Sequence, residues 1–139
     1  MSKSLLAITA LMVLLLAGCG GGGQVDVAAS GTVSGKIEES QLGPGKAAQA
    51  TFDLSPGSYV LICTVPGHYG EGMSAPLQVS ADASPTASVQ VLLGEWFIRP
   101  TPGSVGAGRV AFEAHNQGGS SHNLVILRTD LPHDALVVK

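Results

Sequence analysis

Residues 59–73 read YVLICTVPGHYGEGM, and this stretch decides the fold because it predicts a strand that runs straight into a side-chain-rich loop. The apolar run from Tyr59 to Cys63 is typical of a buried β-strand, and Pro66-Gly67 marks a turn directly after it. His68 follows Cys63 after four intervening residues, and Met73 follows His68 after the same gap. The pattern therefore predicts a thiol, an imidazole and a thioether on one loop between two strands.

These three side chains are the soft to borderline ligands that suit copper. Two His and one Cys in a trigonal set, with a weak axial Met, form the blue-copper arrangement. One more His must then come from elsewhere in the chain. The alternatives are a buried structural thiol at Cys63, a solvated loop residue at His68 and a core side chain at Met73.

The Cys63-x4-His68-x4-Met73 loop resembles that of the cupredoxin family, the blue type 1 copper proteins, and is similar to the loop of auracyanin, rusticyanin and sulfocyanin-like members. In that family a second His, typically followed by Asn, comes from an earlier strand, and by this resemblance His122-Asn123 takes that position although it comes later in this chain. His115, which also precedes an Asn, is the alternative to His122 as a ligand.

The resemblance implies an all-β protein, a Greek-key sandwich or barrel that holds one type 1 copper ion. It implies single-electron transfer between Cu(I) and Cu(II) with a transient redox protein partner, and no enzymatic activity. The implied metal ligands are His122, Cys63, His68 and Met73, and the implied hydrogen-bonding residues around the thiolate are Asn123 and Thr64. Two other functions remain open at this point: a copper delivery or storage module, and a metal-free β-sandwich binding domain.

The rest of the chain also favours an all-β fold. Glycine is frequent, at 19 residues, aromatic residues make up only 4 %, and no long amphipathic helical pattern occurs. We expect an antiparallel sandwich with Trp96 in the core or on a sheet face, His115 on a strand face and His133 exposed. The expected strands are Thr32–Ile37, Ala50–Leu54, Tyr59–Cys63, Leu77–Ser80, Val89–Leu93, Arg109–Ala114 and Asn123–Leu127.

The two halves stand in the opposite order to that of the family. Residues 24–80 carry the Cys-His-Met loop, residues 81–88 read as a linker, and residues 89–139 carry the His-Asn pair. One explanation is a circularly permuted single domain over residues 24–139, which we expect to be a monomer. The other is a truncated tandem with an incomplete site, of which two chains could pair by exchanging halves.

The N-terminus reads as a targeting segment. Lys3 is followed by an apolar run from Leu5 to Leu16, and Leu16-Ala17-Gly18-Cys19 resembles the bacterial lipobox. We expect a lipoprotein signal peptide over residues 1–18, lipidation of Cys19 and a Gly-rich tether over residues 19–23, which would anchor the domain to a membrane on its periplasmic or cell-surface face. The alternatives are a plain secretory signal and a disulfide between Cys19 and Cys63.

The charge balance excludes one class of partner. The 139 residues include 7 Lys and Arg against 10 Asp and Glu, for a formal net charge of −3. Since no basic cluster is present to neutralise phosphates, we expect no nucleic-acid partner.

Overall fold

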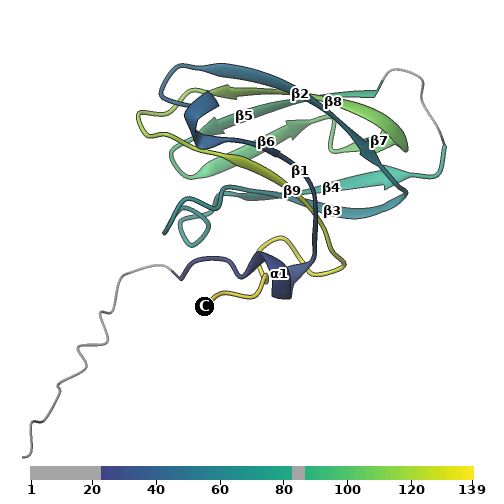
Figure 1. Cartoon of the computed structure of the whole chain (residues 1–139), viewed down its shortest axis with the longest axis horizontal. Coiled ribbons are helices and arrows are strands. Elements are labelled where there is room, and N and C mark those ends of the chain that lie inside the picture. The colour runs from purple at the N-terminus through teal and green to yellow at the C-terminus, as the bar shows by residue number, and fades with distance from the viewer. Residues whose placement is uncertain (1–22, 83–86) are drawn as a thin grey trace, which may run out of the picture.

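Two β-sheets lie face to face in the computed structural model, which describes residues 23–82 and 87–139 (Figure 1). The first sheet has five strands, in the order β1 (Thr32–Ile37), β9 (Leu124–Arg128), β3 (Gly57–Ile62), β4 (Ser74–Ser80) and β7 (Ser104–Gly106). The second has four, in the order β2 (Ala47–Leu54), β8 (Gly108–Asn116), β5 (Ala87–Gly94) and β6 (Phe97–Thr101). The two short helical turns are α1 (Val27–Ser30) and η1 (Glu39–Gln41). The predicted all-β sandwich is confirmed.

The two halves of the chain are interleaved within each sheet. Strand β9 pairs with β1 on one side and β3 on the other, and β8 pairs with β2 and with β5. The last strand thus lies between two strands of the first half, with Ile126 opposite Leu61. This arrangement brings the start of β9 beside the end of β3, which is where the predicted ligands of the two halves lie.

Strand direction differs in part from the expected antiparallel pattern. Strands β4 and β7 pair in parallel, and so do β5 and β8, so both sheets are mixed. Strands β6 and β7 were not expected, and Pro100 lies in β6 opposite Val91. Proline is tolerated there because β6 is an edge strand and need not donate a hydrogen bond on its outer side.

The main core fills the space between the sheets. Alternate residues of β8 point inward, and the largest of them, Phe112, is fully buried. On the facing sheet β4 alternates in the same way and buries Leu77 and Val79. This period of two is the expected signature of strands with one face in a core and one face toward solvent.

A second apolar cluster covers the outer face of the five-stranded sheet. In Figure 1 the segment with α1 and the C-terminal segment lie together below this sheet. They bury β3 and β9 on both faces, which explains why the sequence of these two strands is continuously apolar instead of alternating. The cluster consists of Val25, Val60, Ile62, Val125, Leu127 and Leu136.

Several predictions for the chain ends and the linker lie outside the described residues. These are the signal peptide over residues 1–18, lipidation of Cys19, the tether except Gly23, and residues 83–86 of the linker. Among the helices that the structure describes, none is long and apolar enough to cross a membrane.

Candidate metal centre

Three potential metal ligands meet where β3 and β9 adjoin. Cys63 directly follows β3, and His68 lies in the loop that comes next. Asn123 alone separates His122 from the start of β9. The Cys63 Sγ atom lies 3.5 Å from Nδ1 of His68 and 3.9 Å from Nδ1 of His122, and the two Nδ1 atoms are 3.1 Å apart. The structure therefore brings together side chains from both halves, 59 residues apart in sequence.

Backbone hydrogen bonds close the loop that carries Cys63, His68 and Met73. The Cys63 amide donates to the Met73 carbonyl at 3.2 Å, and the Met73 amide donates to the His68 carbonyl at 3.2 Å. The His68 amide in turn donates to the Val65 carbonyl at 3.0 Å, in the turn that Pro66-Gly67 form. The loop therefore holds its ligand residues through its own backbone, and Met73 on the same loop is completely buried.

His122 is held by contacts of the loop between β8 and β9. Its amide donates to the Leu42 carbonyl at 3.1 Å. The buried Asn116 side chain donates to that same carbonyl and to the Ser120 carbonyl, at 2.8 Å and 2.7 Å. Because Leu42 belongs to the first half, these bonds fix the His122 segment against the other half of the chain.

Asn123 and Thr64 join the two ligand segments directly. The Thr64 amide donates to Oδ1 of Asn123 at 2.7 Å, and Nδ2 of Asn123 donates to Oγ1 of Thr64 at 2.9 Å. This pair of hydrogen bonds joins the segment after Cys63 to the segment after His122 and so fixes the separation of the two residues.

The site is buried, and its electrostatics follow from that burial. Cys63, Met73 and His122 are each 0 % exposed, whereas His68 is partly exposed. Burial raises the pKa of the Cys63 thiol above its usual 9.0, although backbone N–H groups of Asn123 and Val65 lower it in part. Burial lowers the pKa of His122 below its usual 6.5, nearby His68 lowers it further, and Glu95 raises it in part. Both shifts disfavour charge on the metal-free side chains.

The three ligand atoms fit a transition-metal ion. A point equidistant from three atoms with these separations lies about 2 Å from each, and bonds from such an ion to His nitrogen and Cys sulfur are roughly 2.0–2.3 Å long. Two imidazole Nδ1 atoms this close in a buried site need either a shared proton or a shared cation. A Cys and two His ligands through Nδ1, with a buried thioether on the same loop, match the donor set of a copper site.

Two residues at this site were missed from the sequence, Glu95 and Trp96. They form the two-residue turn between β5 and β6 and flank the two His rings. Trp96 has a φ of 75°, unusual for a bulky residue, and its ring centroid lies 5.0 Å from that of His68 in an edge-on arrangement. The expectation that Trp96 lies in the core or on a sheet face is wrong, because it is 40 % exposed in this turn.

Glu95 lies next to His122. One carboxylate oxygen, Oε1, is 3.5 Å from Nε2 of His122. The Gly119 amide donates to Oε2 at 2.7 Å and the Ser120 amide donates to Oε1 at 2.8 Å, and these bonds lower the pKa of the Glu95 carboxyl. A turn signal between two apolar runs, Gly94 followed by Glu95-Trp96, was available in the sequence, but nothing local indicated what the turn would face.

The other His residues lie away from the three ligands. His115 is on β8 and its Nε2 lies 2.9 Å from a carboxylate oxygen of Glu113, so it does not replace His122. His133, expected to be exposed, is half-buried and shares a 2.9 Å hydrogen bond through Nδ1 with the Ser74 hydroxyl.

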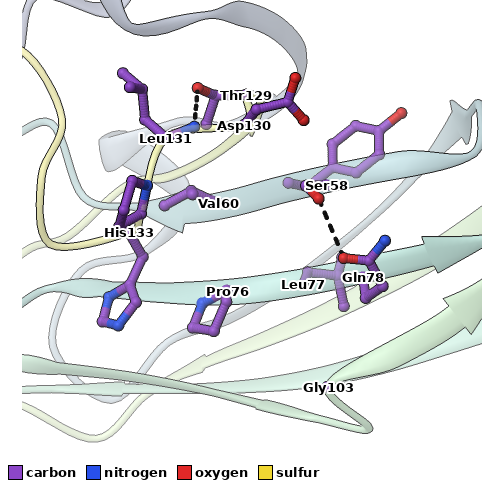
Figure 2. A pocket seen from close by; sticks show the side chains of 12 residues that line it. Ser58, Val60, Pro76, Leu77, Gln78, Gly103, Thr129, Asp130, Leu131 and His133 are labelled. Atoms are coloured by element: carbon purple, nitrogen blue, oxygen red, sulfur yellow. Dashed lines mark hydrogen bonds between the residues drawn. The ribbon is translucent and has the colours of Figure 1, made fainter.

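A cavity of about 380 Å³ lies beside His133, between the paired residues 58–60 of β3 and 76–78 of β4 and the loop after β9 (Figure 2). Val60, Pro76, Leu131 and His133 line it, and Figure 2 shows the Ser58–Gln78 hydrogen bond at its other end. None of Cys63, His68, Met73 or His122 lines this cavity. The metal centre is instead a compact cluster of ligands, as expected for a small ion.

Comparison with known proteins finds one family. Residues 21–80 match the model of the copper-binding proteins of the plastocyanin/azurin family. This segment contains the loop from Cys63 to Met73, and the structure adds His122 from the part beyond the match. Searches among curated proteins and solved structures return no match.

Proposed function

We propose that this chain is a mononuclear blue-copper electron-transfer protein whose metal ligands are Cys63, His68, His122 and Met73. The match of residues 21–80 to the plastocyanin/azurin copper-binding family supports this proposal. The observation that carries the proposal is the convergence of Sγ of Cys63 with the Nδ1 atoms of both His residues, all within 4.8 Å of one another. Bound copper would supply the one-electron couple between Cu(I) and Cu(II).

Rigidity of the ligand side chains supports electron transfer over the other copper functions. Cys63, His122 and Met73 are fully buried, and the loop and the Asn123–Thr64 pair hold them through hydrogen bonds of 2.7–3.2 Å. Side chains held this way change position little when the charge at the centre changes, so the barrier to moving an electron is small. A delivery module would need ligands that let go of the ion, and three fully buried ligands do not favour release.

His68 and Trp96 are the proposed route for the electron to the surface. His68 is the partly exposed member of the ligand set, and the edge-on contact with the exposed Trp96 extends the site outward. The exposed Pro66 lies on the same loop as His68. We propose that the exposed apolar residues Pro66 and Trp96 dock a redox protein partner. The complex should be transient, because the partner must dissociate after each electron transfer.

We also propose that the domain is a circular permutant of the usual family order. Three observations support this. The two halves interleave in both sheets, each half supplies different ligands to one site, and residues 24–25 and 138–139, at the two ends of the described domain, lie side by side. Val25 bridges Val138 in antiparallel fashion, and the Lys139 amide donates to the Gln24 carbonyl at 2.9 Å. A short turn would therefore suffice to join these ends.

A re-ordered chain tests the permutation. Residues 87–139 would be joined to residues 23–80 through a short Gly-Ser turn, which opens the chain in the 81–86 segment. We expect this chain to fold as a monomer and to bind one copper ion with the same spectrum as the original. A native chain that binds copper only as a dimer would instead indicate a truncated tandem with exchanged halves.

For the cellular location, we propose a lipid anchor at Cys19 on an external membrane face. The support is the signal-like sequence over residues 1–18 and the lipobox-like residues before Cys19. Changing Cys19 to Ser should move the protein from the membrane fraction to the aqueous fraction. Unchanged membrane association would contradict the anchor.

Copper titration of the purified protein tests the function itself. We expect one equivalent of Cu(II) to produce an intense visible charge-transfer band and the loaded protein to exchange electrons rapidly between its two oxidation states. Fast loss of copper to a chelator together with slow redox cycling would indicate copper delivery or storage. Failure to bind copper at all would refute the proposal.

A further inference from the structure

His122 has a second ring nitrogen that the metal site does not use. Among the described residues, Nε2 of His122 is the one buried side-chain nitrogen or oxygen that has no hydrogen-bond partner of good geometry. The nearest acidic atom is Oε1 of Glu95, at 3.5 Å. A buried polar group without a partner is destabilising, so its position next to a carboxylate needs an explanation.

The Glu95 carboxylate is itself firmly held at this place. It accepts hydrogen bonds from the Gly119 and Ser120 amides, at 2.7 Å and 2.8 Å, in the loop that leads to His122. Gly118 leaves room for it, because a Cβ atom at that position would come within 2.5 Å of Oε2. The two-residue turn that carries Glu95 is short, and Trp96 adopts its positive φ in the same turn. These contacts aim the carboxylate at the His122 ring.

We propose that Glu95 is a positioning residue that holds His122 with its proton on Nε2 and its Nδ1 lone pair directed at the metal. The inference rests on the proposed role of His122 as a copper ligand. A neutral imidazole carries one ring proton, and a carboxylate beside Nε2 favours the tautomer with the proton on that atom. The carboxylate–histidine–metal arrangement fixes the orientation of the ring and makes the imidazole a stronger donor.

The negative charge also affects the balance between oxidation states. A carboxylate close to a ligand stabilises the more positive centre, so Glu95 favours Cu(II) over Cu(I). Removing the charge should therefore raise the reduction potential. Such a change in reduction potential would show that Glu95 acts on His122 and does not only anchor the loop at residues 118–120.

The first test replaces Glu95 by Gln, which keeps the size and one acceptor oxygen. In the metal-free protein, nitrogen NMR should show His122 mainly as the Nε2–H tautomer, and Glu95→Gln should reduce that preference. In the copper-loaded protein, we expect Cu(II) affinity to fall roughly tenfold relative to Cu(I). For a one-electron couple this corresponds to a rise in potential of about 59 mV.

The second variant displaces the carboxylate without removing its charge. Gly118→Ala places a methyl group where Glu95 now lies, and the flexible end of the Glu95 side chain can move away. We expect the same loss of tautomer preference and a rise in potential. Glu113→Gln is the matched control, because Glu113 pairs with His115 on β8 in a second His–Glu contact outside the metal site. It should leave both readouts unchanged.

The inference is overturned if Glu95→Gln matches Glu113→Gln in both the tautomer and the potential. It is also overturned if His122 is the Nδ1–H tautomer in the wild-type metal-free protein. Failure of the proposed function looks different, because the wild-type protein would then show no visible band with Cu(II). The tautomer measurement needs no metal, so it tests Glu95 in either case.

Discussion

Replacing Asn123 by Ala should destabilise the metal-free protein substantially. The Asn123 side chain is 6 % exposed and makes two hydrogen bonds to Thr64, of 2.7 Å and 2.9 Å. Each such bond contributes about 1 kcal/mol, and a buried N–H left without a partner costs about 1–3 kcal/mol. Since the Thr64 amide loses its acceptor, we expect the free energy of unfolding to fall by roughly 2–3 kcal/mol.

Urea denaturation of the metal-free protein, followed by circular dichroism, measures this loss through the midpoint at constant slope. Thr64→Val is the matched control, because it removes Oγ1 but keeps the bond from the Thr64 amide to Asn123, so its effect should be about 1 kcal/mol. The reasoning is refuted if Asn123→Ala lowers the free energy of unfolding by less than about 0.5 kcal/mol, which is less than one ordinary hydrogen bond contributes. It is also refuted if Thr64→Val lowers that free energy as much as Asn123→Ala does.

Three further predictions concern the metal centre and its surface. Cys63→Ser should abolish the intense visible band of the Cu(II) protein while circular dichroism shows an intact fold; a mutant that keeps the colour would rule out the thiolate assignment. Burial lowers the pKa of His122, so the folded metal-free protein favours the neutral form of this side chain. The free energy of unfolding of the metal-free protein should therefore fall as the pH drops below about 6.5. Urea denaturation at several pH values should show this dependence, and the dependence should be weaker in His122→Gln. Trp96→Gly removes the ring beside His68 but also relieves the positive φ, so the free energy of unfolding should change by less than about 1 kcal/mol. The rate of electron self-exchange, measured by NMR line broadening, should fall. An unchanged rate would exclude Trp96 from the route of the electron.

The sequence was informative where one short segment carries several ligands. Cys63, His68 and Met73 lie on one loop, so their spacing alone indicated a metal site before any fold was known. His122 required the family resemblance, because a single His before an Asn is a weak signal and His115-Asn116 offers the same pair. The structure separates the two, since His115 lies on a strand beside Glu113 and His122 lies beside Cys63.

Features that depend on tertiary contacts could not be predicted. The parallel pairing of β5 with β8 follows from how the chain crosses between sheets, and side-chain alternation does not encode strand direction. No local signal linked Glu95 and Trp96 to the metal site, because the His rings they face come from segments more than twenty residues away. A core position was expected for Trp96 because the side chain is large and apolar. In the structure it is instead 40 % exposed and packs against His68.

The central claim is that His122, from the end of the chain, completes a copper site with Cys63 and His68. Electron paramagnetic resonance of the purified Cu(II)-loaded protein tests it most directly. We predict the narrow copper hyperfine splitting of a thiolate-bound blue site, from one copper per chain. A wide splitting, as Cu(II) gives with nitrogen and oxygen ligands alone, would contradict the account.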